Sequence, residues 1–179
     1  MHRRSILTAF ALILSVATPQ AQQPYAGLES RTIKALSNEQ IADLKNGRGM
    51  GLALAAELNG YPGPLHVLEL GDRLALTDAQ RSRVQELFDA MKAETVPIGE
   101  KLIALEADLD RQFASKTITA SSLASATEAI GSTQGALRGS HLKYHLLTLA
   151  ELSPAQVHRY TELRGYTTAS PSSSHQHRH

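Results

Sequence analysis

Two histidines at helical spacing are the residues of this chain best suited to chemistry. The segment HLKYH places His141 and His145 four residues apart, which in a helix stacks both imidazoles on one face with Cβ atoms about 5 to 6 Å apart. That spacing suits two adjacent ligands of one transition-metal ion. Both fall on an apolar arc with Leu137, Tyr144 and Leu152. Two histidines packed in a core would show the same pattern, so both interpretations stay open.

A metal site needs more donors than this pair supplies. Zn²⁺, Ni²⁺ and Cu²⁺ bind about four donors or more, so other ligands must come from elsewhere in the fold. His66, in GPLHVLEL, is the main candidate because it precedes the predicted hairpin of two long helices, and its own helix must fold back near that hairpin. A half-buried surface histidine is the alternative for this residue. Further candidate ligands are Glu69, Glu86 and Met91, and no organic cofactor is expected.

A second group of histidines lies in HQHRH, as His175, His177 and His179. Residues from Thr167 onward are mainly Ser, Pro and His, a composition that predicts disorder. Alternating histidines on such a segment bind Ni²⁺, Cu²⁺ or Zn²⁺ loosely and without selectivity. A solvated end with no role in metal binding is the alternative.

Several classes of function are disfavoured by what the sequence lacks. The chain has no cysteine, which excludes disulfides, thiolate metal sites and an acylated lipoprotein cysteine. It has no G-x-S-x-G, Walker, H-E-x-x-H or Rossmann motif, so we do not expect an enzyme. The formal net charge is +1, and without Arg3 and Arg4 there are 16 basic and 17 acidic residues, so nucleic-acid binding has no electrostatic support.

Residues 1–21 have the pattern of a secretory signal peptide. Positive charge from Arg3 and Arg4 precedes a short apolar run, and small residues then suit cleavage after Ala17 or Ala21. The apolar run is shorter than the roughly 20 residues that span a bilayer. We therefore expect cleavage, a periplasmic protein and no stable membrane insertion, while an uncleaved signal stays open.

A short motif occurs three times, as LSNEQ (36–40), LTDAQ (76–80) and LSPAQ (152–156). In each copy the Ser or Thr side chain can accept a hydrogen bond from the backbone N–H three residues on, and the Gln side chain can accept one in return, which makes a capping box. Each copy therefore predicts the first turn of a helix. The predicted N-cap residues are Ser37, Thr77 and Ser153.

Composition and hydrophobic period predict an all-α protein. Val84, Met91, Ile98 and Leu105 recur every seven residues, as in a long amphipathic bundle helix, which Pro97 is expected to kink. Capping signals and helix breakers place the predicted helices at residues 37–45, 50–58, 64–75, 77–113, 120–151 and 153–164. The chain thus divides into the signal (1–21), short helices with a Gly/Pro-rich linker (22–63), a helical hairpin domain (64–166) and the histidine tail (167–179).

Three glycines, Gly131, Gly135 and Gly139, lie four residues apart in the second long predicted helix. Each costs roughly 1 kcal/mol of helix stability relative to Ala, which favours close approach of another helix along this face. A weak, flexible helix is the alternative. Because one hairpin has too few layers to cover its own apolar stripes, we expect a homodimer.

With LTDAQ opening one hairpin helix and LSPAQ closing the hairpin behind a signal peptide, residues 64–165 resemble the LTxxQ proteins of the bacterial periplasm. These are the Spy/CpxP chaperone and stress-regulator family and the related ZraP and CnrX type heavy-metal proteins. The resemblance implies a four-helix hairpin that pairs into an intertwined, cradle-like dimer. Its chaperone members hold unfolded clients without ATP on a concave surface. Residues that would contribute basic charge to such a surface here are Arg81, Arg83, Arg138 and Lys143.

The resemblance also implies metal ligands. The metal-sensing members have a histidine in an L-H sequence before the first motif and a ligand pair late in the second hairpin helix, and Leu65-His66 and His141 with His145 resemble those positions. The chain departs from their pattern at three points. Leu70 stands in place of a second histidine, and Phe88 stands in place of a carboxylate ligand, with Glu86 only nearby. The spacing from His145 to Leu152 is also longer.

Together these features predict a periplasmic, dimeric, non-enzymatic helical protein that binds a transition metal and acts in heavy-metal or envelope stress. The alternative is an ATP-independent periplasmic chaperone that holds unfolded clients and has no specific metal site. A regulator that docks on a sensor-kinase domain is a third possibility.

Overall fold

The computed structural model describes residues 25–166, and every regular element in this range is a helix, which confirms the predicted all-α class. The predicted signal peptide and the histidine tail lie outside the described residues. The elements are η1 (Leu28–Ser30, a 3-10 helix), α1 (Asn38–Lys45), α2 (Leu54–Glu57), α3 (Pro64–Glu69), α4 (Asp78–Ala114), α5 (Ala120–Ala150) and α6 (Pro154–Leu163).

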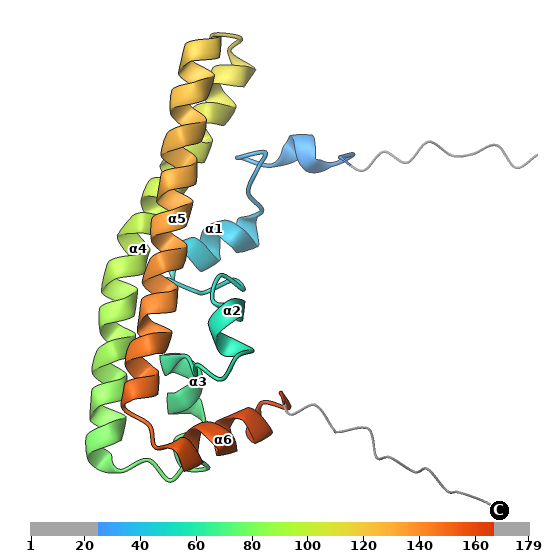
Figure 1. Ribbon diagram of the computed structural model, residues 1–179. Coiled ribbons are helices and arrows are strands. Elements are labelled where there is room, and N and C mark those ends of the chain that lie inside the picture. The colour runs from blue at the N-terminus through green and yellow to red at the C-terminus, as the bar shows by residue number, and fades with distance from the viewer. Residues whose placement is uncertain (1–24, 167–179) are drawn as a thin grey trace, which may run out of the picture.

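Two long helices, α4 and α5, form the frame of the molecule. Figure 1 shows them side by side, with the short helices α1, α2 and α3 along one side and α6 across the end away from the turn that joins the long pair. That turn, residues 115–119, includes Lys116 in a left-handed conformation with φ of 58°. α4 continues through Pro97. The candidate site lies between the short helices and the long pair.

The three predicted capping boxes are all present. The backbone N–H groups of Gln40, Gln80 and Gln156 donate to the side chains of Ser37, Thr77 and Ser153 at 3.1 to 3.3 Å, and each glutamine side chain accepts in return from the N-cap N–H. A fourth capping box, Thr119 with Ser122, opens α5. The polar first turns thus fix where four of the helices begin.

The last residues of two motif copies also bind each other. The Nε2 of Gln80 donates to the Oε1 of Gln156 at 2.9 Å, and the Nε2 of Gln156 donates to the Oε1 of Gln80 at 3.0 Å. Gln80 donates further to the carbonyl of Glu151, and Gln156 to that of Leu74. The repeated motif therefore joins the start of α4 to the start of α6, in addition to capping both helices.

Two hydrophobic clusters hold the short helices to the long pair. One contains Leu44, Leu102, Ile130 and Leu137, and the other contains Val67, Leu74, Val84 and Tyr160. On α4 the second cluster includes Val84 and the first includes Leu102, and Met91 is buried between these positions. The apolar residues that recur every seven positions in this helix are thus divided between two clusters, and Met91, between them, faces the candidate site.

Two short helices are shorter than predicted. The helix predicted at 50–58 is reduced to α2, because Met50 and Gly51 have positive φ angles of 44° and 81° and so cannot continue a right-handed helix. The helix predicted at 64–75 ends at Glu69, before Gly71, since glycine is a poor helix former, and Ala75 is left-handed with φ of 50°. The residues that are not helical form turns instead.

The three glycines of α5 face no close neighbour within the part of the chain that the structure describes. No atom lies within 4 Å of the position that a Cβ would take at Gly131, Gly135 or Gly139. Close helix packing at this face within one chain is therefore not observed, and the predicted homodimer stays a prediction. No helix among residues 25–166 combines the length and the apolar character that crossing a membrane requires.

Candidate functional site

A cavity of about 500 Å³ lies between the short helices and the long pair, and four of the six predicted ligands among the described residues line it. His141 and His145 come from α5, Met91 from α4 and His66 from α3. Its other walls are the loop from Asn46 to Leu54, the segment around Gly63, and Arg164 and Tyr166 after α6. Histidines that are about 75 residues apart in the sequence thus line one cavity, but no three His, Cys, Asp or Glu side chains of residues 25–166 lie close enough together to hold one metal ion.

His145 is oriented by a backbone group. Its Nδ1 lies 2.6 Å from the carbonyl oxygen of Tyr61, which can only accept, so Nδ1 carries the proton and Nε2 keeps its lone pair. Histidines that bind metals commonly donate their other ring N–H in this way. A Cβ on Gly63 would lie 2.9 Å from the Cε1 of this ring, so only glycine lets the backbone approach so closely. The side chain is 8% exposed.

His141 is the more deeply buried of the pair, at 2% exposure. Its Nε2 is buried and has no hydrogen-bond partner among the described residues. Burial lowers the pKa of this imidazole below its ordinary value, and the nearby His145 lowers the pKa further. His141 is therefore neutral at pH 7, and a neutral imidazole is the form that binds a metal ion.

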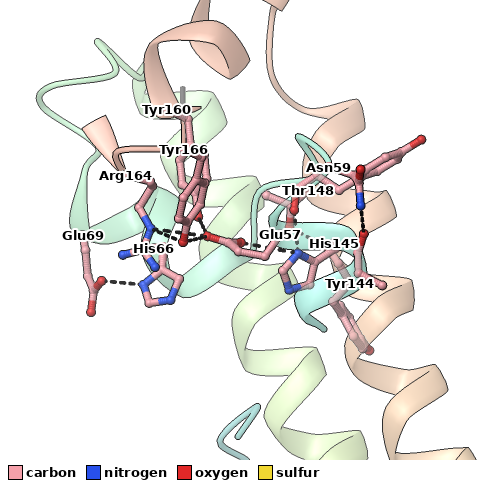
Figure 2. Close-up of polar contacts among 12 residues, drawn as sticks. Glu57, Asn59, His66, Glu69, Tyr144, His145, Thr148, Tyr160, Arg164 and Tyr166 are labelled. Carbon is pink, nitrogen blue, oxygen red and sulfur yellow. Dashed lines mark hydrogen bonds and ion pairs between the residues drawn. The ribbon is translucent and has the colours of Figure 1, made fainter. Parts of the chain in front are cut away.

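A buried carboxylate, Glu57 of α2, joins the cavity to the C-terminal helix. Figure 2 shows it between His145 on one side and Tyr160, Arg164 and Tyr166 on the other. Its Oε1 accepts from the hydroxyls of Tyr160 at 2.5 Å and Tyr166 at 3.1 Å, and the Nε of Arg164 lies 3.3 Å away. Its Oε2 is buried, has no hydrogen-bond partner in the described chain and lies 3.8 Å from the Nδ1 of His145.

His66 and the remaining candidates differ in whether they line the cavity. His66 lines the cavity, is half-exposed, and pairs its Nδ1 with the Oε2 of Glu69 at 2.9 Å, which leaves Nε2 as its free nitrogen. Met91 lines the cavity and is buried. Glu86 does not line it; this exposed residue pairs with Arg83 at 2.7 Å. The tail candidates His175, His177 and His179 lie outside the described residues.

The described residues supply only part of a metal coordination sphere. Across residues 25–166, no three His, Cys, Asp or Glu side chains are grouped closely enough to hold a metal ion. The pair His141 and His145 fits the first two positions, because both rings line one cavity, one offers Nε2 and the other has a buried nitrogen without a partner. Met91 offers a thioether on the facing helix, a soft donor suited to copper(I).

A polar cluster outside the cavity fixes the rotation of α5. Glu94 on α4 accepts from the hydroxyl of Ser140 at 2.7 Å and from that of Tyr144 at 3.0 Å, and it pairs with Lys143. The hydrogen bond from Lys143 is the main cause that lowers the pKa of Glu94. These three residues alternate with His141 and His145 along the helix, so their contacts hold both imidazoles toward the cavity.

Sequence reasoning missed Glu57 and Glu94, and for different reasons. Glu57 lies in a short segment without a motif, and its partners are more than 100 residues away along the chain. Glu94 is one of many acidic residues on a long helix, and its contacts to α5 depend on the register of the two helices. The sequence carries no local signal for either contact.

The burial of His141 has a consequence for stability that can be measured. Because the folded state disfavours its protonated form, the unfolded chain binds more protons at this residue below its ordinary pKa of 6.5. The contribution of His141 to the free energy of unfolding is therefore fully present above that pH, and it is lost as the pH falls toward the lowered pKa. Urea titrations at about pH 7.5 and about pH 5.5 should show a larger loss in the wild type than in His141→Gln. Equal losses in both proteins would contradict this assignment, since the two proteins differ only in the side chain at position 141.

Comparison with known proteins assigns no chemistry to this cavity. Its interpretation rests on the residues that line it and on their contacts. The chain matches no protein-family model, no curated protein and no solved structure.

Proposed function

We propose that this protein binds a transition-metal ion in the cavity between the short helices and the long pair, with His141 and His145 as the first two ligands. The observation that carries the proposal is the unpartnered, buried Nε2 of His141, in the same cavity as an imidazole whose Nε2 is left available by the hydrogen bond to Tyr61. More than nine in ten buried polar groups have a partner, so a buried nitrogen without one calls for a reason.

Binding would act on the arrangement of the short helices. The ligand pair belongs to α5, whereas the facing walls of the cavity belong to α2, α3 and the loops around them. An ion bound both by the pair and by a group of those walls would favour the closed state, in which the short helices lie against α5, over an open state in which they do not. The shift is limited to the difference in the affinity of the two states for the ion. Such a shift in conformation would allow a protein without an active site to signal that metal is bound.

The wider setting belongs to the same proposal. The signal pattern of residues 1–21 supports export to the periplasm, and the LTDAQ and LSPAQ motifs support a relationship to the Spy/CpxP-like proteins of metal and envelope stress. The glycine face of α5 supports a homodimer, because each glycine weakens the helix and no described atom lies within 4 Å of the position that a Cβ would take at Gly131, Gly135 or Gly139. A sensor-kinase domain is the kind of regulatory partner that this setting would offer.

The test is a calorimetric titration of the full chain with Zn²⁺, Ni²⁺ and Cu²⁺. The double variant His141→Ala with His145→Ala is expected to lose about 100-fold or more in affinity at the tight site, because both of its first ligands are gone. His158→Ala, which removes an exposed histidine of α6, is the control and should bind as the wild type does. Unchanged affinity and stoichiometry in the double variant would contradict the proposal.

A pair of glycine variants tests the role of ring placement without removing a ligand. Gly63→Ala places a methyl group 2.9 Å from the ring of His145 and is expected to weaken metal binding about tenfold by displacing the imidazole. Gly49→Ala places its methyl group 3.8 Å from the Nδ1 of His141, an ordinary contact, and should bind metal normally. Equal affinities in the two variants would show that the position of the His145 ring does not matter.

A client-holding chaperone is the second candidate, and one observation favours it. Leu54 and Leu58 of the α2 region and Leu146 and Leu147 of α5 are exposed, and α2 contacts α5. Apolar side chains on neighbouring surface elements suit the capture of unfolded segments. If the double variant His141→Ala with His145→Ala suppressed aggregation of an unfolded client without metal or nucleotide, this candidate would be supported. If the metal-free wild type failed to suppress that aggregation, the chaperone function would be excluded.

A further inference from the structure

Both internal methionines of the chain lie at the proposed metal site. The chain has three methionines, Met1, Met50 and Met91. Met50 and Met91 line the same cavity as His141 and His145. A methionine thioether is a soft, uncharged sulfur ligand of the kind that selects copper(I). The cavity therefore combines two imidazoles with two thioethers, and this combination bears on which metal it binds.

Met91 of α4 lies at the level of the histidine pair of α5. Three residues further along α4, Glu94 accepts from the hydroxyls of Ser140 at 2.7 Å and Tyr144 at 3.0 Å, and these two residues directly precede the two histidines. Three residues of a helix rise about 4.5 Å, so these contacts fix the register of the two helices within one turn of Met91. Because Met91 is also buried and lines the cavity, its sulfur belongs to the same space as the pair.

The loop that carries Met50 packs against both long helices. A Cβ on Gly47 would lie 2.8 Å from the Oγ1 of Thr95 on α4. A Cβ on Gly49 would lie 3.8 Å from the Nδ1 of His141 on α5. Met50 follows with a φ of 44°, a left-handed conformation that costs free energy in any residue with a Cβ. It is 40% exposed, so burial in the core does not explain a methionine at this strained position, whereas a role as a ligand does.

The carboxylates near the cavity are engaged in other contacts. The Oε1 of Glu57 accepts from two tyrosine hydroxyls, and its Oε2 lies 3.8 Å from the Nδ1 of His145, the nitrogen that carries the proton. Glu69 pairs with the Nδ1 of His66. Across residues 25–166 no three His, Cys, Asp or Glu side chains are grouped closely enough to hold one ion. Hard oxygen donors therefore do not complete a site around the pair, and soft donors are present.

The charge of the donors favours a monovalent ion. Imidazole and thioether are both neutral, so neither offsets the charge of a bound cation. The charged side chains that line the cavity are one carboxylate, Glu57, and the cations Arg48, Lys92 and Arg164. The repulsion between these cations and a bound ion rises in proportion to the charge of that ion. A divalent ion therefore meets about twice the repulsion that copper(I) meets.

We propose, on the basis of the proposed function, that the ion bound in this cavity is copper(I), held by the imidazoles of His141 and His145 and the thioethers of Met91 and Met50. Met91 supplies a buried sulfur from the frame of long helices. Met50 supplies the second sulfur from the loop that covers His141. The four donors together fill a four-coordinate site, which the histidine pair alone does not.

A competition titration with a copper(I) chelator, under nitrogen and with ascorbate as reductant, tests this inference in the full chain. Met50→Leu and Met91→Leu nearly conserve side-chain volume and remove only the sulfur. Each change should lower the affinity for copper(I) about tenfold, and the methionine double variant should lose about 100-fold. A parallel titration with Zn²⁺ is the matched control, because the double variant keeps both imidazoles and should bind Zn²⁺ almost as the wild type does.

The outcomes separate this inference from the proposed function. If the methionine double variant binds copper(I) as tightly as the wild type, while His141→Ala with His145→Ala does not, the cavity binds metal without the thioethers and the inference is wrong. Equal losses for copper(I) and Zn²⁺ in the methionine double variant overturn it as well, because damage to the cavity lowers both affinities alike. If the histidine double variant binds both ions as the wild type does, the proposed function itself fails.

X-ray absorption at the copper edge gives a readout that does not depend on affinity. The chain has no cysteine, so a sulfur neighbour of bound copper(I) comes from methionine. The wild type should show sulfur and nitrogen neighbours, and the methionine double variant should show only the lighter atoms. A wild-type spectrum without sulfur would overturn the inference. Sulfur that persists in the methionine double variant would overturn it too, since that sulfur would not come from the cavity.

Discussion

Gly99→Ala is expected to lower the free energy of unfolding by about 2 kcal/mol or more, although alanine favours helices over glycine by about 1 kcal/mol. Gly99 lies in the middle of α4 against α1, and a Cβ there would lie 2.6 Å from the carbonyl oxygen and 3.1 Å from the carbonyl carbon of Leu44. Both atoms are backbone, so no side-chain rotation relieves the overlap. α1 would have to move away from the long pair, which would open the hydrophobic cluster around Leu44 and Leu102.

Gly135→Ala is the matched control within one chain, since it makes the same change inside α5. No atom lies within 4 Å of its added Cβ in the described chain, so at protein concentrations at which the wild type is monomeric the variant should be more stable by about 0.5 to 1 kcal/mol. Urea unfolding followed by circular dichroism compares the two variants. A Gly99→Ala protein as stable as the wild type would contradict the packing of α1 on α4. Loss of self-association in Gly135→Ala would instead support a dimer through this face.

Glu57→Ala is expected to cost about 3 kcal/mol of unfolding free energy. The carboxylate is 7% exposed and accepts from two tyrosine hydroxyls, with a guanidinium beside it. Its removal leaves the buried hydroxyl of Tyr160 on α6 without its acceptor, and such a group carries a desolvation penalty of about 1 to 3 kcal/mol. Since these contacts hold α6 against α2, that helix should detach first, and hydrogen exchange of its amides should speed up.

Glu57→Gln separates the charge of this residue from its shape. The amide keeps one acceptor oxygen for Tyr160 and loses only the ionic attraction to Arg164, so the cost should be about half that of Glu57→Ala. Thermal or urea unfolding of both variants beside the wild type makes the comparison. If Glu57→Ala unfolded at the wild-type urea concentration, the carboxylate would not hold α6 in place.

Much of the helical framework was predictable because its signals are local. The capping boxes at Ser37, Thr77 and Ser153 lie within five-residue stretches, and the apolar period of α4 lies within one helix. The fourth box was missed because Ser122 stands where Glu or Gln is usual. The short helices were overextended because left-handed residues such as Met50 and Ala75 have no reliable sequence signal.

The candidate site was predictable in its histidines and not in its surroundings. The spacing of His141 and His145 already implied one face of one helix. Both residues line one cavity with His66, but the three histidines are not grouped closely enough to hold one ion. The acceptor for His145 is a backbone carbonyl, which every residue carries and no sequence pattern marks. The burial of Glu57 depends on α6 returning to α2, a tertiary event that composition and period do not encode.

The reciprocal amide pair of Gln80 and Gln156 restricts how the chain can change. Each side chain gives one hydrogen bond to the other and takes one back, at 2.9 and 3.0 Å. A glutamate at either position would place two acceptor oxygens opposite each other, and glutamates at both would also place two negative charges there. A shorter residue at one position would leave the other glutamine without its hydrogen-bond partner. Gln80 and Gln156 should therefore covary, and a replacement at one position should be tolerated only with a compensating replacement at the other.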